Sequence, residues 1–95
     1  MTYHIYMLRC ADGTLYTGVT TDIARRVEEH NTSPRAARYT RSRRPVELVY
    51  AEKAASRSAA LVREAAIKRY TRATKEALAQ SGHATKKKGA KRKAS

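Results

Sequence analysis

Apolar residues concentrate in two short segments near the start of the chain. YHIYMLRC (residues 3–10) and LYTGVT (residues 15–20) are rich in aromatic and in long or β-branched apolar residues, which is typical of β-strands. The intervening ADGT contains the dipeptide Asp-Gly, a strong turn signal. The pattern therefore predicts an antiparallel hairpin.

Immediately after the hairpin the spacing of apolar residues changes to that of a helix. Ile23 and Val27 lie four residues apart, as expected for two side chains on one helix face that packs against a core. Thr21 or Asp22 supplies an oxygen suited to cap the helix N-terminus. We therefore predict a helix that runs from this cap to about His30.

The second half of the chain predicts one more strand and two more helices. VELVYAEK (46–53) alternates like a strand, SRSAALVREAAIKRY (56–70) has helical periodicity, and TKEALAQ (74–80) predicts a short helix that Gly82 ends. The stripe of the longer helix contains Ala60, Leu61, Glu64, Ile67 and Lys68. Residues 31–45 show no such pattern and are expected to form a long connection.

The order β-β-α-β-α-α predicts an α+β fold, with a three-stranded antiparallel sheet flanked by helices. A chain of 95 residues has room for one domain. We place this domain at residues 1–82. Residues 83–95, HATKKKGAKRKAS, lack apolar periodicity and are expected to be a disordered basic tail.

Positive charge is the strongest compositional signal. The chain has 21 Lys and Arg residues against 8 Asp and Glu residues, a net charge of +13. Six of these cations lie in residues 83–95, so the predicted domain is itself basic. Such a charge is typical of proteins that bind nucleic acid. The candidate contacts are Arg25, Arg35, Arg38, Arg41, Arg43, Arg44 and Lys68.

Other classes of protein are disfavoured. Cys10 is the single cysteine, so no internal disulfide is expected, which fits a reducing compartment. No apolar run is long enough to span a membrane, and the first residues do not resemble a signal peptide. We expect a monomeric protein of the cytoplasm, where association with the nucleoid is an open alternative.

The length of the hairpin loop decides whether Tyr6 and Tyr16 share a face of the sheet. A two-residue loop at Asp12 and Gly13 would place the two rings on opposite faces, because side chains alternate along a strand. A three-residue loop that starts at Ala11 pairs Tyr6 with residue 18, which is glycine, and puts both rings on one face. Gly13 suits the left-handed position of such a loop. Alternatively, the two tyrosines only pack against their neighbours, as tyrosine often does in strands.

An ordered set of motifs goes beyond these single residues. HIY near the N-terminus, YTG ten residues later, the helix TDIARRVEEH and a glutamate on a later helix resemble the GIY-YIG nuclease family over residues 3 to about 70. The chain resembles the small single-domain, uncharacterised bacterial members of that family. Three features depart from the pattern. His4 replaces the first glycine, no asparagine follows the glutamate (Asn31 is the only one), and no separate DNA-recognition domain is present.

The resemblance implies a metal-dependent endonuclease that cuts phosphodiester bonds, with DNA favoured over RNA. Its catalytic residues fall on Tyr6, Tyr16, Arg26 (with Arg25 as the neighbouring candidate), His30 and Glu64, with Gly18 as the motif glycine. We therefore predict that Tyr6 and Tyr16 lie on one face of the hairpin, near Arg26 and His30. A tyrosine hydroxyl beside a cation accepts a proton, and an arginine fork stabilises the phosphorane charge. Glu64 is the implied ligand of a single Mg²⁺ or Mn²⁺ ion, which keeps several waters. His30 is expected to assist proton transfer or to hold a phosphate.

Each of these residues also has a structural interpretation. Glu64 can pair with Lys68 four residues on, and Arg26 can pair with Asp22. His30 suits the C-terminus of a helix. At the level of function, a nucleic-acid-binding module that kept the fold without the chemistry remains open. A ribosome-associated structural protein is a third alternative.

Overall fold

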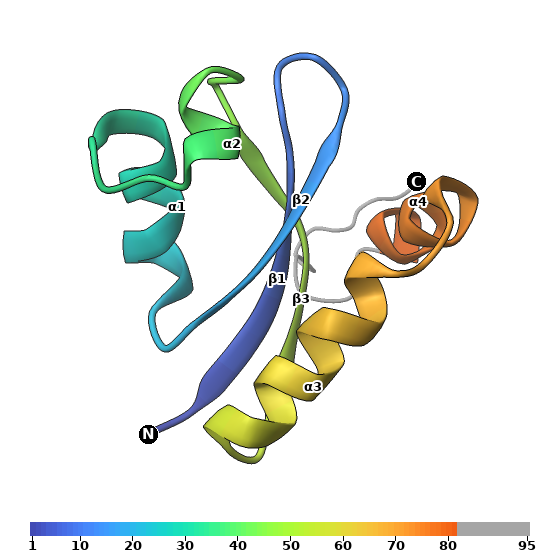
Figure 1. Cartoon of the computed structure of the whole chain (residues 1–95). Helices are drawn as coiled ribbons and strands as arrows, with labels where there is room; N and C mark the ends of the chain where they lie inside the picture. The colour runs from blue at the N-terminus through green and yellow to red at the C-terminus, as the bar shows by residue number, and fades with distance from the viewer. Residues whose placement is uncertain (82–95) are drawn as a thin grey trace, which may run out of the picture.

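The computed structural model describes residues 1–81, within which lie three strands and four helices (Figure 1). Gly82 and the predicted tail, residues 83–95, lie outside the described residues. The elements are β1 (Tyr3–Arg9), β2 (Leu15–Thr20), α1 (Ile23–Thr32), α2 (Arg38–Arg41), β3 (Glu47–Ala54), α3 (Arg57–Lys68) and α4 (Arg72–Ser81).

The sheet is antiparallel and has the strand order β2-β1-β3. Figure 1 shows α1 and α2 on one side of the sheet and α3 and α4 on the other. The predicted α+β fold is confirmed, with strand and helix ends within a few residues of those expected. None of the helices in residues 1–81 has the length and apolar character needed to cross a membrane.

Each face of the sheet carries its own small core, because alternate β1 side chains point to opposite faces. On one face Ile5 and Met7 pack with Ala60 and Ile67 of α3. On the other face Tyr6, Leu8 and Cys10 pack with partly buried residues that include Ile23 and Val27 of α1. The expected stripe of α3 is correct for Ala60 and Ile67, whereas Leu61 is 39% exposed and lies at its margin.

The hairpin has the odd loop that the shared tyrosine face requires. Cys10 N–H donates to Thr14 O at 2.8 Å, which leaves Ala11, Asp12 and Gly13 in the loop. Gly13 has φ +87°, in the left-handed region that side chains with a Cβ rarely adopt. The register then pairs Tyr6 with Gly18 and Leu8 with Tyr16. The prediction that Tyr6 and Tyr16 share a face is confirmed.

Of the two caps predicted for the first helix, Thr21 and Asp22, the structure uses Asp22. Asp22 caps α1 by accepting from Arg25 N–H, and Ser56 caps α3 by accepting from Ala59 N–H. The Arg26 side chain pairs with Glu29 and not with Asp22.

Residues 31–45 form the expected long connection between α1 and β3, and part of it is helical. They include the four-residue helix α2, which is too short to show a periodic pattern in the sequence. Asn31 fixes the far end of this segment through two hydrogen bonds to the backbone of Val46. Arg44 fixes it to α1 by donating to His30 O at 2.6 Å and to Ser33 O.

Candidate active site

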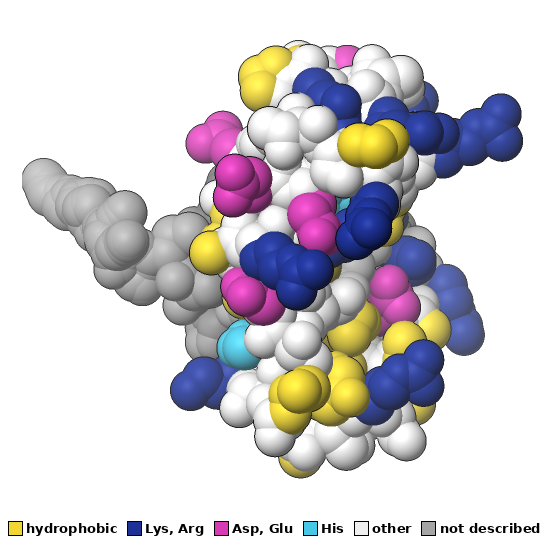
Figure 2. Space-filling model, turned by 90° about the vertical axis from the view of Figure 1, so that its left-hand side faces the viewer, with side chains coloured by type: hydrophobic (Ala, Val, Ile, Leu, Met, Phe, Trp, Pro, Cys, Tyr) yellow, Lys and Arg dark blue, Asp and Glu magenta, His cyan; other side chains and the backbone are white. Residues whose placement is uncertain are grey.

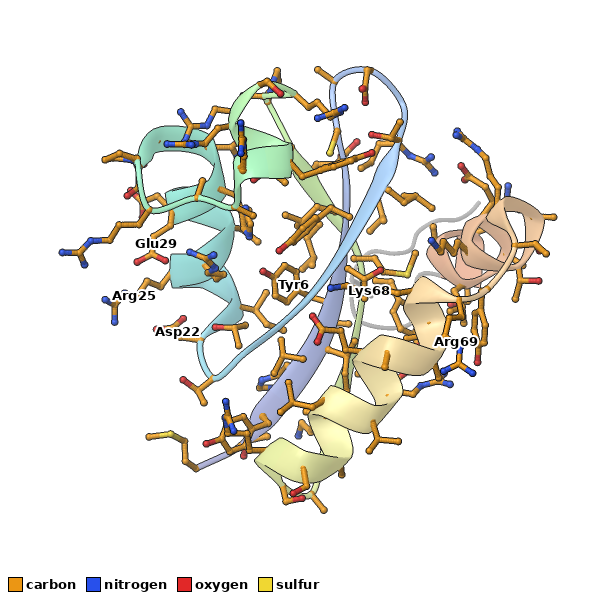
Figure 3. All side chains as sticks on the ribbon, viewed as in Figure 1. Tyr6, Asp22, Arg25, Glu29, Lys68 and Arg69 are labelled. Carbon is orange, nitrogen blue, oxygen red and sulfur yellow. The ribbon has the colours of Figure 1, made fainter. Side chains whose placement is uncertain are left out.

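Tyr6 lies at the centre of the sheet face that α1 covers, and its position depends on a glycine. A Cβ built on Gly18 would approach the Tyr6 hydroxyl oxygen to 2.5 Å, which is closer than real Cβ contacts. The glycine therefore makes room for the ring beside β2. In Figure 3 the Tyr6 ring lies between α1 and the strands, where it is only 1% exposed.

A buried row of hydrogen bonds runs from Tyr6 through His30 to Thr40. The Tyr6 hydroxyl is 2.8 Å from His30 Nε2, and His30 Nδ1 is 2.6 Å from Thr40 Oγ1. The Thr40 hydroxyl donates to Ala37 O, so it accepts from the Nδ1–H of the imidazole. This arrangement leaves Nε2 as the acceptor of the Tyr6 proton, an assignment made from the hydrogen-bond network.

Burial sets the charge state of this row. Desolvation, followed by the positive charge of Arg26, lowers the pKa of His30 from 6.5 to about 4. Burial and then the neighbouring Tyr16 raise the pKa of Tyr6 to about 12, although Arg26 opposes the shift. At neutral pH both side chains are uncharged. Because both His30 nitrogens are occupied and the ring is fully buried, the expectation that His30 holds a phosphate is wrong for this structure.

Tyr16 is the tyrosine that reaches the surface. Its ring centroid lies 6.4 Å from that of Tyr6 and 5.2 Å from that of His30. On its other side it stacks against Tyr39 of α2, with a centroid distance of 6.0 Å and an angle of 28° between the rings. Half-buried, Tyr16 lines a hollow along β2 together with Thr17, Tyr39, Lys68 and others.

Arg26, and not the neighbouring Arg25, turns toward this cluster. The influence of its charge on the pKa values of Tyr6 and His30 places its guanidinium beside them. Arg26 is 26% exposed and pairs with Glu29 at 2.9 Å. Arg25, by contrast, lies with Asp22 and Glu29 on the side of α1 that points away from the strands (Figure 3).

Glu64 reaches the cluster from α3. Its negative charge is the weakest of the causes that shift the pKa of Tyr6, so the carboxylate acts on the tyrosine electrostatically. It is 19% exposed and pairs with Lys68 at 3.3 Å, so the predicted ion pair is present. Glu64 therefore has a structural role as the partner of Lys68 and also an electrostatic influence on Tyr6.

A divalent cation fits Glu64 by the chemistry of its donor. Carboxylate oxygen is the ligand that Mg²⁺ and Mn²⁺ prefer, and Glu64 retains solvent access. Within residues 1–81 no group of three or more His, Cys, Asp or Glu side chains gathers to form a closed metal cage. A metal at Glu64 would thus depend on waters and on the substrate for its remaining ligands.

The predicted nucleic-acid contacts divide into exposed and engaged arginines. Arg25, Arg35, Arg38 and Arg41 are exposed. Arg43 pairs with Asp12 at 3.0 Å and lies 3.9 Å from the centroid of the Tyr39 ring. Arg44 donates from Nε and Nη2 to backbone carbonyls, so it also has a structural role in this segment.

Basic and acidic side chains alternate on the side of the molecule that α1 occupies. Figure 2 shows Lys and Arg next to Asp and Glu on this face. The Arg25–Glu29 and Arg26–Glu29 pairs of α1 are examples. The net charge of the chain is therefore not spread as a uniform positive field over this face.

Three residues near the site were not among the candidates predicted from the sequence. Thr40 binds His30 from α2, Tyr39 stacks on Tyr16, and Lys75 of α4 lines the hollow beside Tyr16. Thr40 and Tyr39 lie in the segment that lacked a pattern. Lys75 was one of many lysines, and only the packing of α4 brings it beside β2.

Comparison with known families places this cluster in context. Residues 2–77 match the model described as the GIY-YIG catalytic domain. The chain belongs to the GIY-YIG family. This family acts on nucleic acids.

The chain is also similar to small GIY-YIG proteins whose names state no activity. It is 56% identical over 79 residues to a UPF0213 protein of Desulfotalea psychrophila, and the match covers 83% of this chain and 72% of that protein. It is 52% identical over 80 residues to one of Haloquadratum walsbyi, covering 84% and 89% of the two chains.

Two solved structures share the fold. The solution structure of a UPF0213 protein from Bacillus halodurans is 38% identical, with a TM-score of 0.56 over 90% of this chain and 89% of that one. A protein from E. faecalis is 41% identical, with a TM-score of 0.58 over 85% of each chain.

Proposed function

We propose that this protein is a metal-dependent endonuclease that hydrolyses phosphodiester bonds of nucleic acid, with DNA favoured over RNA. One observation carries the proposal. Tyr6, Tyr16, Arg26, His30 and Glu64 come from β1, β2, α1 and α3 and form one cluster around the Tyr6 hydroxyl. A cation, a carboxylate and two tyrosines beside an open hollow are groups that phosphodiester hydrolysis requires.

Exposure assigns different tasks to these groups. Arg26, Tyr16 and Glu64 retain accessible surface, so these three contact the substrate. The guanidinium of Arg26 offers paired N–H donors to the phosphoryl oxygens, whose negative charge grows in the transition state. Tyr16 orients the attacking water from the hollow along β2.

Tyr6 and His30 are buried beneath these groups and act as proton carriers. The Tyr6 hydroxyl already donates to His30 Nε2, so its oxygen can take up a proton while it passes its own to the imidazole. In the proposed step the water oxygen bonds to phosphorus and its proton passes through the Tyr6 hydroxyl to His30. The bond to the leaving oxygen breaks, that oxygen takes a proton from solvent, and His30 later returns its proton to solvent. A phosphodiester beside Arg26 offsets the charge that helps to lower the pKa of His30, which makes the imidazole a better acceptor.

Glu64 is the residue that would hold the divalent cation. When bound, such an ion supplies charge neutralisation at the leaving oxygen. Lys68 competes for the same carboxylate at 3.3 Å. Substrate phosphate beside Lys68 would draw the ammonium away from Glu64 and leave the carboxylate available.

A second candidate is a nucleic-acid-binding module without catalysis. The observation in its favour is the charge state of the buried row. A tyrosine with a pKa of about 12 and a histidine with a pKa of about 4 are both poorly matched to proton transfer at neutral pH. The endonuclease requires bound substrate to change these values, whereas the module does not.

The deciding experiment is a cleavage assay with the purified protein. Supercoiled plasmid, branched DNA and structured RNA are each incubated with Mg²⁺ or Mn²⁺, and with EDTA as the matched control. The endonuclease proposal expects cuts that require the metal. Binding to these nucleic acids without cleavage by any metal would instead support the module.

A further inference from the structure

A continuous groove runs along the exposed edge of β2. One hollow of about 360 Å³ and a neighbouring one of about 200 Å³ share Leu15, Tyr39 and Lys75 in their walls. We call this feature the β2 groove. Its walls are Thr14, Leu15, Tyr16, Thr17, Tyr39, Lys68, Arg72 and Lys75.

Among residues 1–81, the walls of the groove include three cations and no carboxylate, although two of these cations pair with Glu64 and Glu76 behind the walls. Lys68 comes from the end of α3, and Arg72 and Lys75 come from α4. Figure 3 shows Lys68 between α3 and the strands, whereas the adjacent Arg69 lies on the outer side of the helix. A concave surface with this lining attracts an anion.

Lys75 distinguishes the groove from ordinary basic surface. Lys68 is paired with Glu64, and Arg72 donates to Gly13 O at 3.1 Å and contacts Glu76 at 3.4 Å. Lys75 lines both hollows and is half-buried, yet within residues 1–81 its ammonium has no carboxylate partner. A partly desolvated cation without a partner is stabilised when a phosphate takes that position.

The groove is also continuous with the candidate active site. Tyr16 belongs to both, and Lys68 contacts Glu64. A strand whose scissile phosphate lies at Arg26 and Glu64 would therefore pass over Tyr16 into the groove. The apolar surface of Leu15 and the 38% exposed Tyr39 ring would face the sugar and base of that nucleotide.

We propose that the β2 groove binds the backbone of one nucleic acid strand next to the scissile phosphate, with Lys75 as its phosphate contact. The location relative to the scissile bond rests on the proposed endonuclease function. The binding itself does not, because it depends only on the cations and the shape of the groove.

The test uses the full chain with EDTA present, so that no metal-dependent cleavage interferes and the Lys68–Glu64 pair at the groove is kept. Lys75→Gln removes the charge and keeps a long polar side chain, and Lys53→Gln is the matched control. Lys53 is an exposed lysine of β3, at the opposite edge of the sheet. Fluorescence anisotropy measures binding of a short single-stranded DNA, and of RNA with the same sequence, across a salt series.

Lys75→Gln should weaken binding about threefold to tenfold near physiological salt, and should reduce the salt slope by about 0.7, the value for one phosphate contact on a single strand. Lys53→Gln should change both by much less. A stronger effect on DNA or on RNA identifies the preferred strand. Equal effects of the two variants on nucleic acid binding would overturn the groove proposal. So would a Lys75→Gln variant that loses affinity only for an acidic peptide, used as a competitor, and not for nucleic acid.

The two proposals fail in different ways. If wild-type protein cuts DNA but Lys75→Gln binds like Lys53→Gln, the groove assignment alone is wrong. If Lys75→Gln weakens binding selectively while no form of the protein cuts nucleic acid, the groove assignment holds and the endonuclease proposal is wrong. Thermal unfolding of each variant checks that binding differences come from folded protein.

Discussion

At the scale of single residues, the position of Tyr6 depends on the absence of a side chain at Gly18. The two residues are directly paired across β1 and β2, and a Cβ at Gly18 would also approach the Tyr6 ring carbon Cζ to 2.6 Å. Because the Tyr6 ring is buried and bonded to His30, a side chain at residue 18 could be accommodated only if the ring shifts. Gly18 therefore fixes the geometry of the buried row.

We predict that Gly18→Ala displaces Tyr6, weakens its bond to His30 and lowers the free energy of unfolding by about 1–3 kcal/mol, as overpacking does. Gly13→Ala is the control, since it strains a left-handed loop but meets no atom within 4 Å. Urea unfolding measures the stabilities, and NMR of the His30 ring reports the site. The same His30 signals in wild type and Gly18→Ala would contradict the prediction.

His30 makes stability depend on pH. Its pKa is about 4 in the folded protein against 6.5 ordinarily, so between these values the unfolded chain binds more protons. The contribution of neutral His30 to stability should therefore be fully present above pH 6.5. The free energy of unfolding should fall by about 3 kcal/mol as pH drops toward 4. Unfolding of His30→Gln over the same range provides the comparison. An equally steep decline in the variant would show that other groups cause it.

At the scale of elements, α2 is the part of the fold that most needs outside support. A four-residue helix is not stable alone. Thr40 holds it to α1 through His30, Tyr39 holds it to β2 through Tyr16, and Arg43 holds it to the hairpin loop through Asp12. Because α2 carries Tyr39, these contacts also shape one wall of the β2 groove.

We predict that Thr40→Val loosens α2, because it leaves the buried Nδ1–H of His30 without an acceptor. The expected decrease in unfolding free energy is about 1–3 kcal/mol. Thr40→Ser keeps the hydroxyl and should retain most of the stability. Hydrogen exchange localises the effect: faster exchange in residues 37–43 of the valine variant agrees with the account, and protection equal to that of the serine variant disagrees.

These elements also mark the limit of what the sequence could predict. The order of the tyrosine motifs, with Gly13 in the loop, favoured the register that places both tyrosines on one face, and the start of the first helix was expected at Thr21 or Asp22. Contacts such as Thr40 with His30, or Lys75 with the β2 edge, join segments that no periodic pattern relates. Arg44 resembled the other loop arginines in the sequence, and only its hydrogen bonds to backbone carbonyls reveal its different role.

At the scale of the whole molecule, charge and chemistry are separate contributions. The net charge of +13 includes six cations in residues 83–95, none of which is a candidate catalytic residue. Long-range attraction of nucleic acid depends on the sum of these charges, whereas cleavage depends on a few groups at fixed positions. A change in net charge should therefore affect binding affinity, whereas a change in the site should affect the rate of cleavage.

We predict that deletion of residues 83–95 weakens nucleic acid binding and flattens its salt dependence. For duplex DNA, the slope should become shallower by about 0.9 for each phosphate that these residues neutralise. The rate of cleavage of fully bound substrate should remain that of the full chain. Binding isotherms across a salt series provide the measurement, and an unchanged slope would exclude the tail from the binding surface.

The central claim is that Glu64 makes this cluster a metal-dependent active site, and the most direct test compares Glu64→Ala with Glu47→Ala. Both changes remove one carboxylate, but Glu47 is exposed on β3 at the far edge of the sheet. Plasmid nicking with Mg²⁺ or Mn²⁺ is measured at saturating protein. The account predicts a decrease of about 10²–10³-fold for Glu64→Ala, with folding and binding intact, and a near wild-type rate for Glu47→Ala. Nicking by Glu64→Ala at the wild-type rate would contradict it.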